Sequence, residues 1–173
     1  GKPLREHIYP RLVYRFQYEN RLKLFAEVEP KKIFDCVVYK GTADEISFDS
    51  INNIFHPNVI DLCYAHGGDG VCHGILIQQS NGRSIPNLEG HKERIIHYNS
   101  ELLQIISKIF EDDAEWKSCK LVSLHSVGIL DIMKKMQGFT CVSNWCPEIS
   151  EAFHATNSRK DNTIELNTKL ANY

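Results

Sequence analysis

The hydrophobic positions of this chain recur either at alternate residues or at every third or fourth residue, and these two spacings predict strands and helices. Residues 11–29 alternate apolar and polar side chains on both sides of Glu19 and Asn20, which is typical of an antiparallel hairpin. An apolar run at 33–39, followed by Gly41, predicts a further strand. We therefore expect an antiparallel strand pair near the N-terminus.

A short helix and a buried strand are expected next. Thr42 suits a helix N-cap and Pro57 suits the end of the same helix. Residues 58–65 are apolar on both faces, which is typical of a central strand covered by helices on each side. The apolar face of the expected helix comprises Ile46, Ile51, Ile54 and Phe55.

Strand and helix patterns continue to alternate in the second half of the chain. A short strand is expected at 74–78, followed at 88–112 by the longest helical pattern, with apolar residues three or four positions apart. Residues 119–126 predict another strand, and residues 128–137 predict a helix that Gly138 closes.

The last expected elements are a strand at 139–145 and a helix from Pro147 to about Thr156. Residues 157–173 are polar and weakly patterned, which predicts a partly disordered tail. Strands that alternate with helices indicate an α/β fold, a three-layer sandwich around a mainly parallel sheet. We expect residues 1–156 to form a single domain of this kind.

The composition is ordinary for a globular protein, with 42% hydrophobic and 24% charged residues among 173. The net charge of -2 gives no electrostatic reason to expect a nucleic-acid partner. No apolar run approaches the roughly 20 residues that cross a bilayer, so no membrane partner is expected. The chain starts at Gly1 without a signal-peptide core, and we expect it to belong to a larger multidomain protein.

Cysteine usage favours a reduced, intracellular protein. Four of the six cysteines lie in apolar runs, where cysteine usually acts as a small buried hydrophobe. An even number of cysteines also suits a disulfide framework, but no Asn-x-Ser/Thr acceptor site accompanies it. The six are Cys36, Cys63, Cys72, Cys119, Cys141 and Cys146.

Two apolar runs lead into loops whose side chains are capable of chemistry. The run 58–65 leads into His66 and a glycine-rich turn, and the run 119–126 ends at Ser126. Because sites in α/β sheets favour the carboxyl ends of strands, these two loops are the expected functional positions.

The order of these motifs, together with the segment Val-Ser-Asn-Trp at 142–145, resembles the caspase-like CHAT protease domains, which are related to separases. The resemblance covers residues 33–155. It implies a caspase-like fold in which His66 is the general base and the backbone of Gly67 and Gly68 supplies an oxyanion-hole amide.

The sequence departs from the CHAT pattern where that family has its cysteine nucleophile, because residues 124–128 contain none. Ser126 marks the nucleophile position, and its hydroxyl is far harder to deprotonate than a thiol. We therefore expect a catalytically inactive pseudoprotease that acts in protein–protein interaction or regulation. The alternative is an active peptidase that uses Ser126. Ser126 also suits the N-cap of the following helix.

A protein or peptide segment is the expected partner. The expected contact surface is the former cleft around His66, with Gly67, Gly68, Asp69 and Trp145 as binding residues. A second surface is the strand edge at 11–29, to which a partner strand could add. His66 itself also suits a simpler role, as a histidine that hydrogen-bonds the turn.

Two other kinds of site remain open, and no cofactor or metal is expected in the preferred interpretation. The sequence from 124 to 128 resembles a degenerate nucleophile elbow of an α/β-hydrolase, with His154 available later. A zinc site would draw on soft ligands near the glycine turn, and Cys141 with Cys146 could add two more. The ligands of such a zinc site are Cys63, His66, Cys72 and His73. The histidines expected at the surface are His7, His56, His91 and His97.

Overall fold

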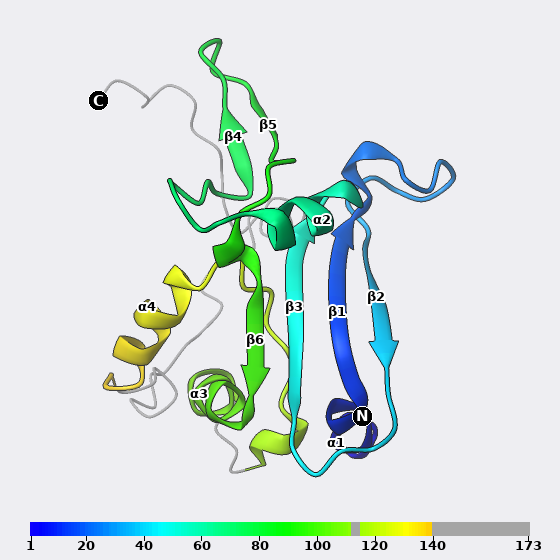
Figure 1. The fold of residues 1–173 in the computed structure, drawn as a ribbon, viewed down its shortest axis with the longest axis vertical. Helices are drawn as coiled ribbons and strands as arrows, with labels where there is room; N and C mark the ends of the chain where they lie inside the picture. The colour runs from blue at the N-terminus through cyan, green and yellow to red at the C-terminus, as the bar shows by residue number, and fades with distance from the viewer. Residues whose placement is uncertain (112–114, 140–173) are drawn as a thin grey trace, which may run out of the picture. The chain divides into compact units, whose positions relative to one another are not determined.

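The computed structural model of the protein describes residues 1–111 and 115–139, and Gly1–Phe139 form one compact unit. At its centre lies a four-stranded mixed sheet in the order β2-β1-β3-β6 (Figure 1). The β1–β3 pair is parallel, whereas β1–β2 and β3–β6 are antiparallel. The four strands are β1 (Leu12–Glu19), β2 (Ile33–Tyr39), β3 (Ser47–Ile54) and β6 (Ile96–Asn99).

In the described part of the chain, four α-helices and a small second sheet surround this centre. Strands β4 and β5 form the antiparallel second sheet. Its bounds and those of the helices are α1 (Lys2–Ile8), α2 (Asn58–Ala65), α3 (Ser100–Phe110), α4 (Gly128–Met136), β4 (Leu76–Gln78) and β5 (Ser84–Pro86). Short 3-10 turns are η1 (Tyr9–Arg11), η2 (Asn20–Leu22), η3 (Lys92–Arg94) and η4 (Trp116–Ser118).

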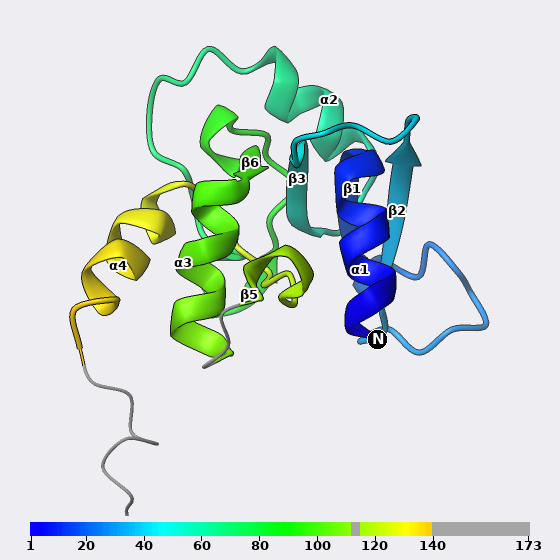
Figure 2. The ribbon, with the colours of Figure 1, turned by 90° about the horizontal axis from the view of Figure 1, so that it is seen from below.

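The two faces of the sheet bury different apolar clusters, because successive strand side chains point to opposite faces. On one face Phe48 stacks on Tyr98 at 5.0 Å between ring centroids, within a cluster that α3 and α4 complete. On the other face Ile51 packs with Val59 and Cys63 of α2. Figure 2 accordingly shows α2 on one side of the sheet and α1 and α3 on the other.

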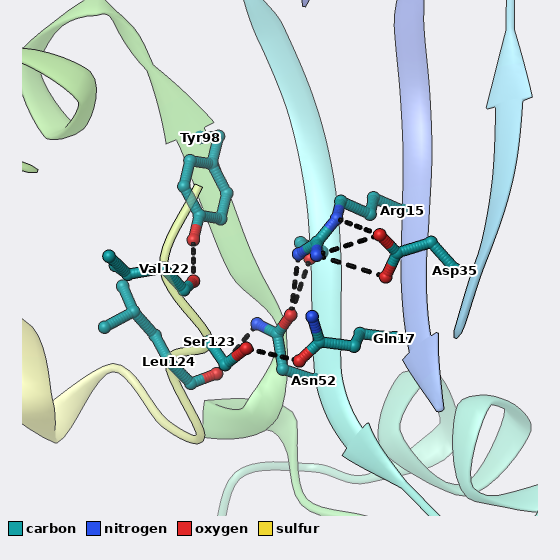
Figure 3. Close-up of polar contacts among 9 residues, drawn as sticks. Arg15, Gln17, Asp35, Asn52, Tyr98, Val122, Ser123 and Leu124 are labelled. Carbon is teal, nitrogen blue, oxygen red and sulfur yellow. Dashed lines mark hydrogen bonds and ion pairs between the residues drawn. The ribbon is translucent and has the colours of Figure 1, made fainter. Parts of the chain in front are cut away.

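The segment 119–126 lies against the sheet without joining it as a strand. Side-chain donors hold its carbonyls instead: the Tyr98 hydroxyl donates to Val122 at 2.8 Å, and the Asn52 amide donates to Leu124 at 2.9 Å (Figure 3). The Tyr9 hydroxyl donates to the carbonyl of Cys119 at 2.7 Å. Three carbonyls of this segment therefore have hydrogen-bond donors although the segment pairs with no strand.

A polar network lies beneath the segment 119–126 on the same face of the sheet (Figure 3). Arg15, which is 7% exposed, forms an ion pair with Asp35 at 3.1 Å and donates to the Asn52 side chain at 2.9 Å. The Ser123 hydroxyl donates to the Gln17 side chain. Buried polar groups such as Arg15 and Asn52 are tolerated because each has partners.

Several elements expected from the sequence are confirmed. The α/β class is correct, and β2 spans the strand expected at 33–39. The strand expected at 74–78 is present as β4, and the helix expected at 128–137 is present as α4. An antiparallel pair lies near the N-terminus, but it joins β1 to β2 across the loop 20–32.

The predictions for the two elements in the middle of the chain are wrong. The expected helix is a strand, and the expected strand is a helix. Residues 47–54 form strand β3 instead of a helix, since Ser47 and Asp49 alternate with buried residues. Residues 58–65 form helix α2 instead of a strand, with Val59 and Cys63 buried four positions apart on one face. Pro57 thus precedes a helix, where its fixed φ is favourable, and does not end one.

Three further expectations need correction. The sheet is mostly antiparallel, not mainly parallel, and a three-layer caspase-like sandwich is not confirmed. Only residues 100–110 of the helix expected at 88–112 are α-helical, because residues 96–99 pair with β3 as strand β6. Residues 21–29 do not form the expected second strand: η2 ends at Leu22, and a loop follows whose Phe25 and Val28 carbonyls accept hydrogen bonds from the Asn20 side-chain amide. Apart from Phe139, the strand expected at 139–145 lies outside the described residues, as does the helix expected from Pro147 to about Thr156.

Candidate functional site

Three chain segments meet at what we call the loop junction: residues 66–74, 89–94 and 123–127. Nε2 of His125 donates to the carbonyl of His73 at 2.9 Å. The N–H of Val127 donates to the carbonyl of Glu93 at 2.8 Å. The segment that contains Ser126 therefore contacts both the segment after α2 and a third segment, 89–94, which the sequence did not mark.

His66 shapes the glycine turn at this junction. The residue follows α2 directly and is half-buried, and its Nδ1 accepts the N–H of Gly68 at 3.0 Å. Gly68 has a φ of +100°, a backbone conformation that glycine adopts readily. Gly67 and Asp69 are exposed. The contact agrees with the simpler role considered for His66, that of a histidine that hydrogen-bonds its turn.

Ser126 lies half-buried just before α4, where its carbonyl accepts the N–H of Ile129 at 3.2 Å. The N-cap of α4 is Val127, so Ser126 does not occupy the N-cap position that it suits from the sequence. Among the described residues, no hydrogen bond joins the His66 ring to the Ser126 hydroxyl. Trp145, the other expected contact residue, lies outside the described residues.

The loop junction also contains a cluster of three different ligand types: Cys72, His91 and Glu93. One ligand atom from each lies within 4.8 Å of the other two. His91 is only 5% exposed, and the ring of His66 lies beside it, with 4.3 Å between the centroids. Nδ1 of His91 accepts the N–H of Glu93 at 3.2 Å, while its buried Nε2 has no hydrogen-bond partner among the described residues.

Sequence reasoning identified only part of this cluster. Cys72 was considered as a zinc ligand, but His91 was expected at the surface. Cys63, another candidate ligand, lies within α2 and is fully buried, and desolvation raises the pKa of its thiol. A His-x-Glu pattern at 91–93 was the available signal, and its pairing with residue 72 depends on the tertiary fold.

Burial shifts the pKa values of two side chains at the loop junction, Cys72 and His125. Desolvation raises the pKa of the Cys72 thiol, and the nearby Glu93 carboxylate raises it further. Desolvation also lowers the pKa of His125, which is buried with its hydrogen bond to His73. Cys72 is therefore a neutral thiol at neutral pH and is not activated as a nucleophile.

A second arrangement lies on the sheet face that α2 covers in part. Nδ1 of His97 lies 2.8 Å from Asp49, and Nε2 of His97 lies 3.4 Å from the Ser47 hydroxyl. The hydroxyl of Tyr64 donates to the other oxygen of Asp49 at 3.3 Å. Adjacent strands create this set, because Asp49 of β3 is directly opposite His97 of β6.

The order serine, imidazole, carboxylate matches a nucleophile, a base and a residue that orients the base. The surroundings do not favour catalysis, however, because the side chains of His97 and Asp49 are 56% and 29% exposed. Water weakens the electrostatic stabilisation on which such sites depend. The sequence suggested only a surface histidine here, since the set forms through strand pairing.

Strand β2 is the third notable feature, at the outer edge of the sheet. Among the described residues, no strand pairs with its outer side. Six of its seven residues are exposed, and they include Ile33 at 62%, Val38 at 47% and Tyr39 at 49%. The edge expected at 11–29 is therefore misplaced, because β1 lies inside the sheet and β2 forms the edge.

Comparison with protein-family models, curated proteins and solved structures finds no match for this chain. Within residues 1–111 and 115–139, every helix is too short or too polar to span a membrane. The four cysteines in this part of the chain have free thiols.

Proposed function

We propose that this domain is a protein-binding module and that β2 binds an extended segment of a partner protein by strand addition. The observation that carries the proposal is an exposed apolar edge strand. Strand addition uses the unpaired backbone groups of such an edge for affinity and the alternating side chains for specificity.

The amino-acid composition of β2 favours an edge strand that binds a partner strand over one that is only exposed to solvent. Natural edge strands are usually protected from pairing by lysine, proline or a bulge. The interior of β2 contains neither lysine nor proline, and its one charged residue, Asp35, forms an ion pair with Arg15. Lys32 and Lys40 lie only at its ends.

The exposed side chains of β2 indicate which kind of partner segment it binds. Val38 and Cys36 lie on the face that bears Tyr14 and Phe16, whereas Val37 lies on the opposite face beside Arg15. A partner strand with β-branched or aromatic residues at alternate positions would cover these exposed side chains. We therefore propose that the ligand of β2 is an extended, apolar segment of another protein.

The proposal keeps the expected protein-binding role without relying on the protease resemblance. His66 and Ser126 do not lie at the ends of two strands, because residues 58–65 form a helix and residues 119–126 form no strand. That the domain is an inactive relative of CHAT proteases stays a proposal about its evolutionary origin. The proposed binding role is argued from β2 alone.

A charged substitution on β2 tests the binding role. We expect Val38→Lys to weaken binding of peptides selected from a random display library at least tenfold, about 1.4 kcal/mol, because lysine opposes strand pairing. Ile132→Lys is the matched control, since Ile132 is an apolar residue of α4 that is 60% exposed. Fluorescence anisotropy with labelled peptides measures both affinities.

Equal affinity of the Val38→Lys variant and the wild type would contradict the role of β2. Sedimentation of the free protein separates a different occupant, a second copy of the chain. A dimer that Val38→Lys dissociates would replace the proposed partner with self-association.

Ester or amide hydrolysis is a second candidate function, favoured by the Ser47, His97 and Asp49 arrangement alone. Because Nδ1–H donates to Asp49, Nε2 is free to accept the proton of the Ser47 hydroxyl. The hydroxyl oxygen would then attack the acyl carbon of an ester or amide and break its bond to the alcohol or amine, which leaves with the proton that Nε2 of His97 took up. Water would then release the acyl group from Ser47 as a carboxylic acid.

A fluorophosphonate probe tests this second function. Reaction forms a bond from Ser47 Oγ to phosphorus and releases fluoride, so labelled protein is detected by mass spectrometry. If Ser47 is a nucleophile, we expect Ser47→Ala to abolish labelling and Asp49→Asn to slow it tenfold or more. Absence of labelling of the wild type would exclude this function, and loss only in Ser126→Ala would assign it to Ser126.

A further inference from the structure

Cys72, His91 and Glu93 converge from two separate segments of the loop junction, and we propose that they bind a divalent transition metal ion, with zinc as the expected ion. Cys72 comes from the irregular segment that follows α2, whereas His91 and Glu93 flank the start of η3. This site lies outside β2, so it adds to the proposed binding role and does not depend on it.

The convergence of the three groups favours a chelate over a catalytic relay. In a relay, the thiol and the carboxylate lie on opposite sides of the imidazole ring. Here the Cys72 sulfur and a Glu93 oxygen lie within 4.8 Å of each other and of one imidazole nitrogen. Ligand atoms around tetrahedral zinc are roughly 3.3–3.8 Å apart, given bond lengths of about 2.0–2.3 Å. Small side-chain rotations would therefore close the site.

The donor set selects the class of metal. A thiolate, an imidazole and a carboxylate are ligands for zinc and similar borderline ions, whereas magnesium and calcium prefer oxygen ligands alone. Thiolate and carboxylate together supply two negative charges to the divalent ion. Three protein ligands leave a fourth position for water, which the exposure of Glu93 allows.

His91 supplies an independent indication of a ligand. The residue is almost fully buried, and its Nε2 makes no hydrogen bond within the part of the chain that the structure describes. A buried polar atom without a partner is unfavourable, and a metal bond would satisfy it. Ligation through Nε2 requires the ring proton to be on Nδ1. A protonated Nδ1 can no longer accept the hydrogen bond from the Glu93 N–H, so this bond is lost when the metal bond forms. Cys72 releases its proton to solvent.

The bound ion would connect segment 66–74, which has no regular secondary structure, to η3. Buried Arg94 is a nearby positive charge that opposes a cation, and Lys92, between His91 and Glu93, is an exposed one. The guanidinium of Arg94 is held by the carbonyls of Glu89, Asn52 and Asn53, so two anionic ligands outweigh one fixed positive charge.

Cobalt(II) titration of the whole reduced chain tests the site, because tetrahedral cobalt gives visible bands and a sulfur-to-metal charge-transfer band. We expect one equivalent to bind and zinc to displace it. Cys72→Ser should remove the charge-transfer band, and Glu93→Gln should weaken affinity tenfold or more. Cys36→Ser is the matched control, since Cys36 is exposed on β2 and should leave the spectrum unchanged.

Two results would overturn the proposal. One is a wild-type chain that gives no charge-transfer band with cobalt. The other is a band that persists in Cys72→Ser and disappears in the double variant Cys141→Ser, Cys146→Ser, which would place the metal on those cysteines. Circular dichroism of each apo variant checks that the fold is retained, which we expect for Glu93→Gln because Glu93 is exposed.

Discussion

Replacing Gly90 with alanine is expected to destabilise the fold by about 3 kcal/mol. A Cβ atom at residue 90 would lie 2.3 Å from the carbonyl carbon of Leu62 and 2.6 Å from the backbone nitrogen of Cys63. Both atoms belong to the backbone of α2, which cannot rotate away as a flexible side chain does. The helix would have to move off the segment that carries His91, and its packing on Ile51 would be lost.

Urea unfolding followed by tryptophan fluorescence measures this effect. Gly41→Ala is the matched control, because a Cβ at residue 41 meets nothing within 4 Å. We expect the control to change stability by less than about 0.5 kcal/mol. Equal unfolding midpoints for the two variants would show that α2 does not pack against Gly90 as described.

Replacing Arg94 with methionine is expected to have a similarly large effect, a loss of about 3 kcal/mol. Arg94 is fully buried, and its guanidinium donates to the carbonyl of Glu89 at 2.6 Å and to those of Asn52 and Asn53 at 3.4 and 3.2 Å. Methionine fills the space but leaves these acceptors without a donor, each at a cost of about 1–3 kcal/mol. Removal of a desolvated charge offsets only part of this loss.

Thermal and urea unfolding of Arg94→Met measure the loss, with Arg83→Met as the control. Arg83 is exposed in the turn between β4 and β5, so its replacement should be nearly neutral. Unchanged or higher stability of Arg94→Met would mean that the buried charge, and not the unmet carbonyls, dominates the energetics.

Local pattern predicted the elements whose apolar residues have one clear spacing. Helix α4 has apolar residues at three- and four-residue spacing and is followed by Gly138, and β2 is a short apolar run that precedes Gly41. Residues 58–65 form an apolar run of eight, a length at which spacing does not separate a buried strand from a helix. Residues 119–126 have strand-like composition, but side-chain donors from the sheet take the place of strand partners.

The candidate sites were less predictable because they form between distant segments. His66 was found from the chain itself, since a histidine before glycines is a local signal. The approach of Cys72 to His91 and Glu93 depends on how the loop after α2 folds back onto η3. The approach of Ser47 to His97 depends on the register of β3 and β6, which the incorrect helix at 42–57 concealed.

Hydrogen–deuterium exchange of residues 33–39 tests the proposed binding role of β2 most directly. The exchange is measured for the free protein and for the protein bound to a selected peptide or to its cellular partner. We expect the outward-facing amides of β2 to exchange at least tenfold more slowly in the complex, because a partner strand hydrogen-bonds them. Helix α4 should exchange at the same rate in both states. A complex that leaves exchange at 33–39 unchanged would contradict strand addition at β2.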